Sequence, residues 1–213
     1  MTAATLHARP LAPRGTAPGA GLHFFGTAAL FVPTDLPDGS LPMVVLLHGA
    51  TSHPEQALPY LRDQAEEAKF LLLAPKSRAI TWDAIRTGFG PDVEALDTAL
   101  TEVFERFGVD PARIAVAGFS DGASYALGLG LANGDLFSRV IAFSPGFVVP
   151  GPRHGRPPVF VSHGDADPVL PIERCSHRLV PALRATGYQV DFHEFSGGHE
   201  VRPDLATVAV SDL

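Results

Sequence analysis

Three side chains that together can form a nucleophile, an acid and a base occur in this chain in the order Ser, Asp, His. Ser120 is the centre of the pentapeptide GFSDG at 118–122, which has the form G-x-S-x-G, and Asp167 and His199 follow it. A hydroxyl is a weak nucleophile near neutral pH and becomes reactive when a histidine held by a carboxylate removes its proton. The three residue types therefore predict acyl transfer or hydrolysis.

The acid is to be chosen between Asp165 and Asp167, which both follow an expected strand at 159–161. Asp167 is preferred because it stands a few residues beyond the strand end and is pinned by Pro168, whereas Asp165 is the alternative and suits a turn. The same two carboxylates could join His163 in binding a metal. Their spacing fits no zinc pattern, so neither a metal nor a cofactor is expected.

The expected base, His199, follows Gly197 and Gly198 after the last expected strand. Two glycines allow a loop to bring the imidazole back over Ser120. An imidazole with an ordinary pKa near 6.5 accepts and returns a proton at neutral pH.

Two backbone N–H groups are expected to stabilise the oxyanion of an acyl-transfer reaction. One belongs to Asp121, the residue after the nucleophile. The other belongs to Ala50, which follows His48 and Gly49 at the end of another apolar run. We expect His48 itself to hold this loop through a ring hydrogen bond.

Four apolar side chains near these loops are candidates for a substrate pocket: Trp82, Phe147, Val169 and Leu170. The alternative for each is that it only packs its own loop. The two insertions at 76–91 and 144–157 are too short for a cap domain, so the site is expected to be shallow and open. Arg153 and Arg156 are the only basic residues noted near it, which argues against a phosphorylated substrate.

Short apolar runs alternate with amphipathic segments along the chain, which predicts an α/β fold with a doubly wound, mostly parallel sheet. An antiparallel strand or a hairpin at 21–33 is expected at the sheet edge. In such a sheet the active site lies beyond the carboxyl ends of the strands, where the candidate residues fall. The expected strands are at 43–47, 70–74, 114–117, 140–143, 159–161 and 190–195, and the expected helices at 52–68, 93–107, 120–132, 172–185 and 203–210.

The first of these helices is expected to open with a capping box formed by Ser52 and Glu55. The chain of 213 residues suits one domain, which we place at 21–213 after an extended segment at 1–20.

The net charge of −7 argues against nucleic acid and anionic membranes as partners. No apolar run is long enough to span a bilayer. With one cysteine and no recognisable signal peptide, the expected location is cytoplasmic. A homodimer is compatible with the sequence.

The sequence resembles the α/β-hydrolase superfamily, in particular its small phospholipase/carboxylesterase branch, which includes the acyl-protein thioesterases. The resemblance rests on four motifs, which begin at His48, Gly118, His163 and Gly198. It implies an α/β-hydrolase fold with little or no cap, and metal-independent hydrolysis of small-molecule esters or thioesters through an acyl-enzyme. It also implies the residue roles given above.

The sequence departs from that branch at Asp121, where many members carry glutamine. A carboxylate facing the oxyanion would oppose its charge, so this side chain is expected to point away. The sequence also resembles feruloyl-esterase and polyester-depolymerase-like hydrolases. A peptidase of the same fold and a non-catalytic binding protein that kept the scaffold are the remaining alternatives.

Overall fold

The computed structural model describes residues 4–213, and its centre is an eight-stranded sheet with the order β1-β2-β4-β3-β5-β6-β7-β8. Strands β3 to β8 run parallel, while β1 and β2 form the expected antiparallel hairpin at one edge. The strands are β1 (Gly21–Phe25), β2 (Ala28–Val32), β3 (Leu41–Leu47), β4 (Leu71–Ala74), β5 (Val109–Phe119), β6 (Arg139–Phe143), β7 (Val159–Gly164) and β8 (Val190–Phe195). The α/β expectation is confirmed.

The central strands are apolar on both faces because both faces are covered. In β3, Met43 and Val45 belong to one hydrophobic cluster, and Val44 and Leu46 belong to another. All seven residues of β3 are buried. A strand in this position cannot show the polar alternation of a half-exposed strand, which explains the continuous apolar run.

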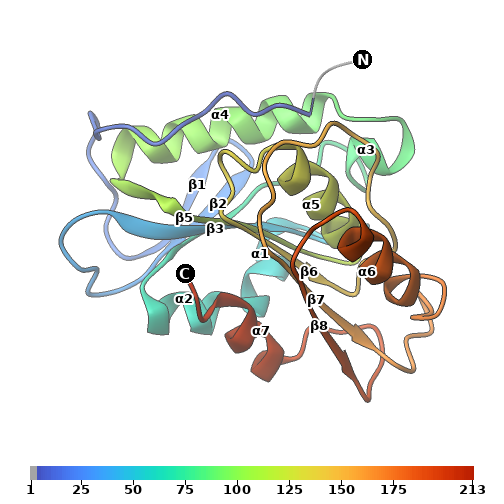
Figure 1. The fold of residues 1–213 in the computed structure, drawn as a ribbon. Coiled ribbons are helices and arrows are strands. Elements are labelled where there is room, and N and C mark those ends of the chain that lie inside the picture. The colour runs from blue at the N-terminus through green and yellow to red at the C-terminus, as the bar shows by residue number, and fades with distance from the viewer. Residues whose placement is uncertain (1–3) are drawn as a thin grey trace.

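The helices form two layers, one on each side of the sheet (Figure 1). Helices α4, α5 and α6 cover one face, and α2 and α7 cover the other. Their bounds are α1 (Pro54–Ala57), η1 (Leu58–Tyr60), α2 (Arg62–Ala68), α3 (Asp83–Arg86), α4 (Pro91–Arg106), α5 (Asp121–Ala132), α6 (Ser176–Ala185) and α7 (Pro203–Val210). Helix α7 has the bounds expected from its opening proline and apolar spacing.

The single helix expected at 52–68 is wrong, because the chain forms α1, the 3-10 turn η1 and α2 there. Pro54 sits in the first turn of α1, so the helix begins after His53 rather than at Ser52. The Ser52 hydroxyl donates to Gln56 Oε1 at 3.1 Å and caps no backbone N–H. Pro59 lacks an N–H group and lies where the continuous helix was expected.

The N-terminal segment lies along the outside of α4 (Figure 1) without regular structure. Leu6 is buried, and its N–H donates to Asn133 Oδ1 at 2.8 Å. Asn133 Nδ2 in turn donates to the carbonyl of Ala4 at 2.7 Å. The expected extended segment at 1–20 is therefore tied to the end of α5 over its described part, and residues 1–3 lie outside the described residues.

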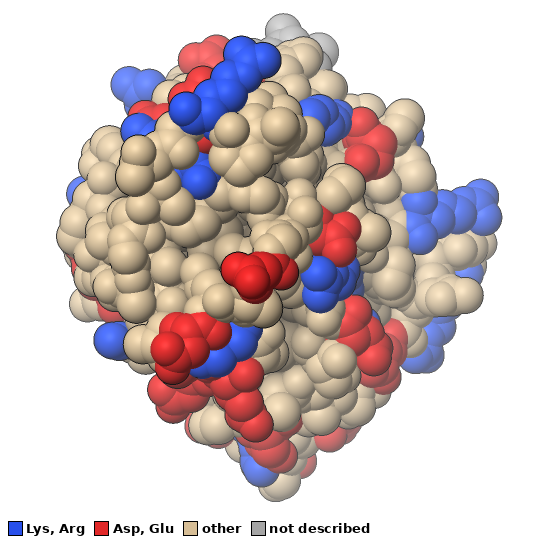
Figure 2. Space-filling view, turned by 90° about the vertical axis from the view of Figure 1, so that its left-hand side faces the viewer, with Lys and Arg blue, Asp and Glu red and all other residues tan. Residues whose placement is uncertain are grey.

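Charged side chains of both signs are interspersed on the face shown in Figure 2, and the basic ones form no continuous field there. The chain carries 16 lysines and arginines against 23 aspartates and glutamates. That nucleic acid is not a partner stays a prediction from this balance. Across residues 4–213, no helix combines the length and apolar character that crossing a membrane requires.

Candidate active site

Ser120 stands at a sharp turn between the end of β5 and the start of α5. Its backbone has φ 59° and ψ −121°, a conformation that costs a non-glycine residue about 1–3 kcal/mol. The turn requires glycine on both sides: a Cβ on Gly118 would lie 2.2 Å from the carbonyl oxygen of Gly122, and a Cβ on Gly122 would lie 2.2 Å from that of Leu47. The G-x-S-x-G spacing thus has a steric cause, and the serine lies just beyond the carboxyl end of a central strand of the sheet.

Asp167 and His199 are brought together by the ends of β7 and β8. The ring Nδ1–H of His199 donates to Asp167 Oδ2 at 2.6 Å. The other carboxylate oxygen accepts the N–H groups of Val169 and Leu170, each at 2.8 Å. Burial opposes ionisation of Asp167, but these hydrogen bonds outweigh it and hold the pKa of the carboxyl below its usual value. The acid is therefore ionised and fixed in orientation.

Asp165, the alternative acid, contacts the backbone of the base loop instead of the imidazole. Its Oδ1 accepts the N–H of Gly197 at 3.1 Å. Gly164 has no room for a side chain, because a Cβ there would lie 2.3 Å from the carbonyl oxygen of Gly198. The end of β7 and the glycine loop before His199 thus lie against each other, and Asp165 positions that loop.

Ser120 and His199 line the same hollow, which has a volume of about 340 Å³. The Phe119 ring lies 4.6 Å from the His199 ring, centroid to centroid, and packs edge-on against Tyr60 at 5.3 Å. Neither aromatic residue was foreseen from the sequence. Phe119 is the variable position of the pentapeptide, and Tyr60 lies in η1 with no motif around it. The hollow is lined by Gly49, Ala50, Ser52, Tyr60, Phe119, Ser120, Val169 and His199.

The loop after β3 is held by His48, whose two ring nitrogens are both engaged. Nδ1–H donates to the carbonyl of Gly49 at 2.8 Å, and Nε2 accepts the N–H of Ser77 at 3.1 Å. Burial lowers the pKa of this imidazole, which favours the neutral form that such bonding requires. Among the described residues no acceptor pairs with the N–H of Ala50, whereas the next N–H, on Thr51, donates to Ile80.

Asp121 begins α5, so its N–H has no acceptor one turn back in the helix. Its side chain accepts a hydrogen bond from the Thr81 hydroxyl at 2.7 Å and is absent from the lining of the hollow. Within residues 4–213, the two N–H groups expected to bind an oxyanion thus both lack an acceptor, and the carboxylate is held beside Thr81.

The four expected pocket residues are separated by the fold. Val169 lines the hollow and is 61% exposed, whereas Phe147 lines a different groove beside α6. Leu170 is in neither lining, and its side chain would lie 3.4 Å from a Cβ on Gly146, a residue of the groove. The structure contradicts the expectation that Trp82 lines a substrate pocket. This side chain is only 1% exposed, and its Nε1–H donates to the carbonyl of His48 at 2.8 Å. An indole N–H needs an acceptor when buried, and here it supports the loop beneath the hollow rather than lining it.

His163 links three elements behind the acid. Its Nε2–H donates to the carbonyl of Leu170 at 2.7 Å and lies 3.2 Å from Asp167 Oδ2. Its Nδ1 accepts the hydroxyl of Ser176, the first residue of α6, at 2.7 Å. Burial lowers the pKa of this imidazole. Within residues 4–213, no group of three or more His, Cys, Asp or Glu residues is arranged to hold a metal. His163 therefore braces the acid loop.

The depressed pKa of His163 predicts a loss of stability in mild acid. The unfolded chain binds a proton on this histidine near pH 6.5 and the folded chain does not, so the free energy of unfolding falls as pH drops below about 6.5. In His163→Asn, the slope of unfolding free energy against pH just below 6.5 is expected to be shallower by up to about 1.4 kcal/mol per pH unit. Urea unfolding at several pH values measures it. The exposed His7→Gln variant is the control, and equal slopes in all three proteins would contradict the prediction.

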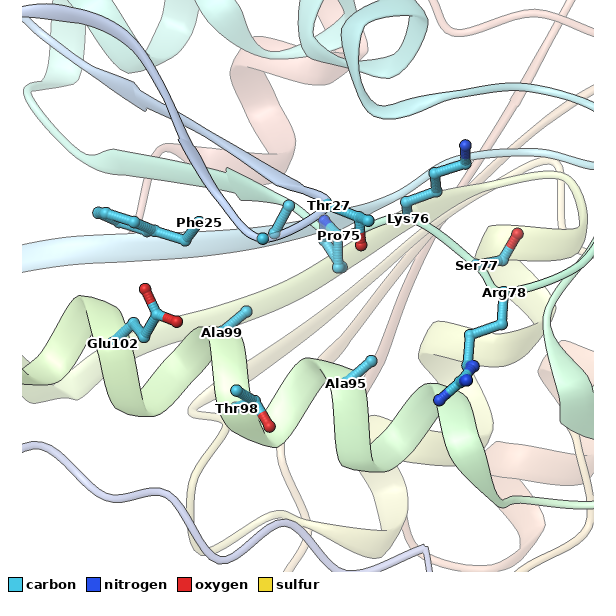
Figure 3. A pocket seen from close by; sticks show the side chains of 12 residues that line it. Phe25, Thr27, Pro75, Lys76, Ser77, Arg78, Ala95, Thr98, Ala99 and Glu102 are labelled. Carbon is cyan, nitrogen blue, oxygen red and sulfur yellow. The ribbon is translucent and has the colours of Figure 1, made fainter.

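A cavity of about 510 Å³ lies away from these residues, between the β1–β2 hairpin and α4 (Figure 3). It contains no histidine, cysteine or aspartate. The hydroxyls of Ser77 and Thr98 in its lining donate to backbone carbonyls. This cavity is therefore larger than the hollow at Ser120, but it does not contain the groups that acyl transfer requires.

Comparisons with known proteins indicate the family of the chain. The model of the phospholipase/carboxylesterase family matches residues 88–209. The putative esterase NocK of Nocardia uniformis subsp. tsuyamanensis is 33% identical over 153 residues, which are 66% of this chain and 44% of that protein. Acyl-protein thioesterase 1 of Gibberella zeae is 29% identical over 107 residues, which are 46% of this chain and 45% of that protein. The match thus spans under half the length of either relative. The crystal structure of esterase PE8 has a TM-score of 0.70 and 25% identity, and covers 85% of this chain and 94% of its own.

Proposed function

Because this chain belongs to the phospholipase/carboxylesterase family of the α/β-hydrolase superfamily, we propose that it is a serine hydrolase of carboxylic esters or thioesters. The observation that carries the proposal is the hydrogen bond from His199 to Asp167 beside the hollow that Ser120 lines. The substrates we propose have small to medium acyl groups, since the hollow has a volume of about 340 Å³.

The proposed reaction begins with attack of Ser120 Oγ on the substrate carbonyl. His199 Nε2 takes the hydroxyl proton, because Nδ1 already donates its own proton to Asp167. The tetrahedral intermediate then collapses, and His199 gives the proton to the departing alcohol or thiol. Water then attacks the acyl carbonyl while His199 removes one of its protons. The bond between the acyl carbon and Ser120 Oγ breaks, His199 returns the proton to Oγ, and the acid product leaves.

We assign the stabilisation of the negative charge on the tetrahedral intermediate to the N–H groups of Ala50 and Asp121. Both are preorganised, one by the loop that His48 and Trp82 hold and the other by the first turn of α5. Donors that are already oriented lower the barrier without reorganisation. The Asp121 carboxylate is bonded to Thr81 and leaves this role to its backbone.

A fluorophosphonate probe tests the proposal, because it forms a covalent bond only with an activated serine. We expect it to label the protein and the Ser52→Ala variant, and to leave Ser120→Ala unlabelled. A non-catalytic binding protein that kept the scaffold would not be labelled at all. Absence of labelling, or labelling that survives Ser120→Ala, would therefore contradict the proposed nucleophile.

Substrate class is tested by one panel of p-nitrophenyl esters of graded acyl length, acyl thioesters, feruloyl esters and peptides. Hydrolysis of simple esters or thioesters by the parent, and none of peptides, is the expected result. Higher kcat/KM for feruloyl esters than for simple esters would instead support the feruloyl-esterase alternative. Exclusive cleavage of peptides would overturn the proposed substrate class.

A further inference from the structure

A second groove, of about 380 Å³, lies between the loop after β6 and helix α6. Its walls carry three arginines, Arg153 from the loop and Arg174 and Arg178 from the α6 side. Its floor is apolar, with Leu179 and Leu183 buried beneath it. The fold thus places positive charge around an apolar floor.

Helical spacing builds one side of the groove. Arg178 and Ala182 are four residues apart in α6, so they share a face of the helix, and Leu179 and Leu183 lie beside them. Arg174 precedes Arg178 by the same interval and lies two residues before the helix begins. The stems of the two arginines can cover apolar surface while their guanidinium groups stay at the rim.

The three guanidinium groups have no carboxylate partner. Several other arginines form ion pairs, for example Arg9 with Asp135 and Arg139 with Asp212. Over residues 4–213, no ion pair involves Arg153, Arg174 or Arg178. Three like charges around one groove of a chain with net charge −7 repel one another, and a bound anion would relieve this repulsion.

The groove adjoins the hollow that holds Ser120. Gly146 lines the groove, and a Cβ on Gly146 would lie 3.4 Å from the Leu170 side chain. Leu170 follows Val169, which lines the hollow. Ser124, one turn after Ser120 in α5, accepts the N–H of Gly146 at 3.0 Å and so fixes the wall between the two spaces. The groove and the hollow therefore lie on either side of the contact between Gly146 and Leu170.

We propose that the groove binds an apolar chain that ends in an anionic group, a carboxylate or a phosphate monoester, through Arg153, Arg174 and Arg178. A consequence, which rests on the proposed function, is that preferred ester substrates carry such a group at the end remote from the scissile bond. The sequence alone argued against phosphorylated substrates because it did not show that Arg174 and Arg178 lie beside Arg153.

Equilibrium binding tests the groove without any catalytic step. Ser120→Ala protein is titrated calorimetrically with sodium octanoate, octyl phosphate and neutral octanol. We expect at least one of the two anions to bind tighter than octanol, and added salt to weaken that binding. The tighter anion identifies the anionic group. If neither anion binds more tightly than octanol, the proposal is overturned.

Two double variants in the Ser120→Ala background assign that binding to the groove. Arg174→Gln/Arg178→Gln is expected to lower the affinity for the preferred anion by about tenfold, because it removes charge-assisted contacts at a partly exposed site. Arg14→Gln/Arg62→Gln removes the same charge elsewhere and should leave the affinity unchanged. Equal affinities in the two double variants would overturn the assignment.

A kinetic comparison then separates the groove from the proposed function. In the active enzyme, the p-nitrophenyl monoester of suberate is compared with p-nitrophenyl octanoate, which has the same chain length and no terminal charge. If the octanoate anion binds the groove, Arg174→Gln/Arg178→Gln should raise KM for the charged suberate ester by about tenfold with little change in kcat. The same variant should leave KM for p-nitrophenyl octanoate unchanged. Anion binding without hydrolysis of any ester would overturn the function and keep the groove. Hydrolysis of an ester without anion binding would overturn the groove and keep the proposed function.

Discussion

Replacing Ser120 with alanine is expected to lower kcat for ester hydrolysis by roughly 10⁴- to 10⁶-fold, with little change in the binding of substrate. The hydroxyl is the only group proposed to form a bond with the substrate. Without it, the oxyanion donors on Ala50 and Asp121 and the positioning of the substrate leave only weak catalysis by water. Steady-state rates with a p-nitrophenyl ester measure the loss, after circular dichroism has shown that the variant is folded.

Ser52→Ala is the matched control for that loss, because Ser52 lines the same hollow and its hydroxyl is bonded to Gln56. Its kcat should stay within about tenfold of the parent. A Ser120→Ala protein that hydrolyses the ester as fast as the Ser52→Ala protein would remove the nucleophile from the mechanism.

The parts of the fold that could be predicted are those whose cause is local in the sequence. The strands at the centre of the sheet were found because burial on both faces demands continuous apolar residues, as in β3. Helix α7 was found with its bounds because Pro203 favours a first turn and the apolar residues recur at helical spacing. The pentapeptide around Ser120 was recognisable because each glycine relieves a specific backbone clash.

The parts that could not be predicted depend on contacts between distant segments. Trp82 was predicted to line a pocket because it lies in a loop. In the structure it is buried and its N–H donates to the carbonyl of His48, a contact that the sequence alone does not reveal. Tyr60 reaches the hollow because the chain turns through η1, which contains Pro59. The arginine groove forms because α6 packs beside the loop after β6, which brings Arg153 near residues about 20 positions away.

The choice between the two aspartates shows the same limit on a smaller scale. Asp165 and Asp167 are two residues apart, and both follow β7. Sequence position favoured Asp167 without excluding Asp165. The hydrogen bonds give the two carboxylates different partners: Asp167 accepts from the His199 imidazole, and Asp165 accepts from the backbone of Gly197.

Asp167→Asn is therefore expected to lower kcat by roughly 10⁴-fold, whereas Asp165→Asn should lower it by less than about tenfold. An amide at position 167 can still accept the N–H groups of Val169 and Leu170 through its oxygen, so its NH₂ group faces His199. That group donates to Nδ1 and favours the tautomer with a proton on Nε2, which then cannot accept the proton of Ser120. At position 165, the amide oxygen still accepts from Gly197, and the base loop keeps its place.

Steady-state kinetics of the two variants, with thermal melts to compare their stability, decide between the carboxylates. Equal losses of kcat in both variants, or a larger loss in Asp165→Asn, would show that the hydrogen bond at 2.6 Å does not identify the acid.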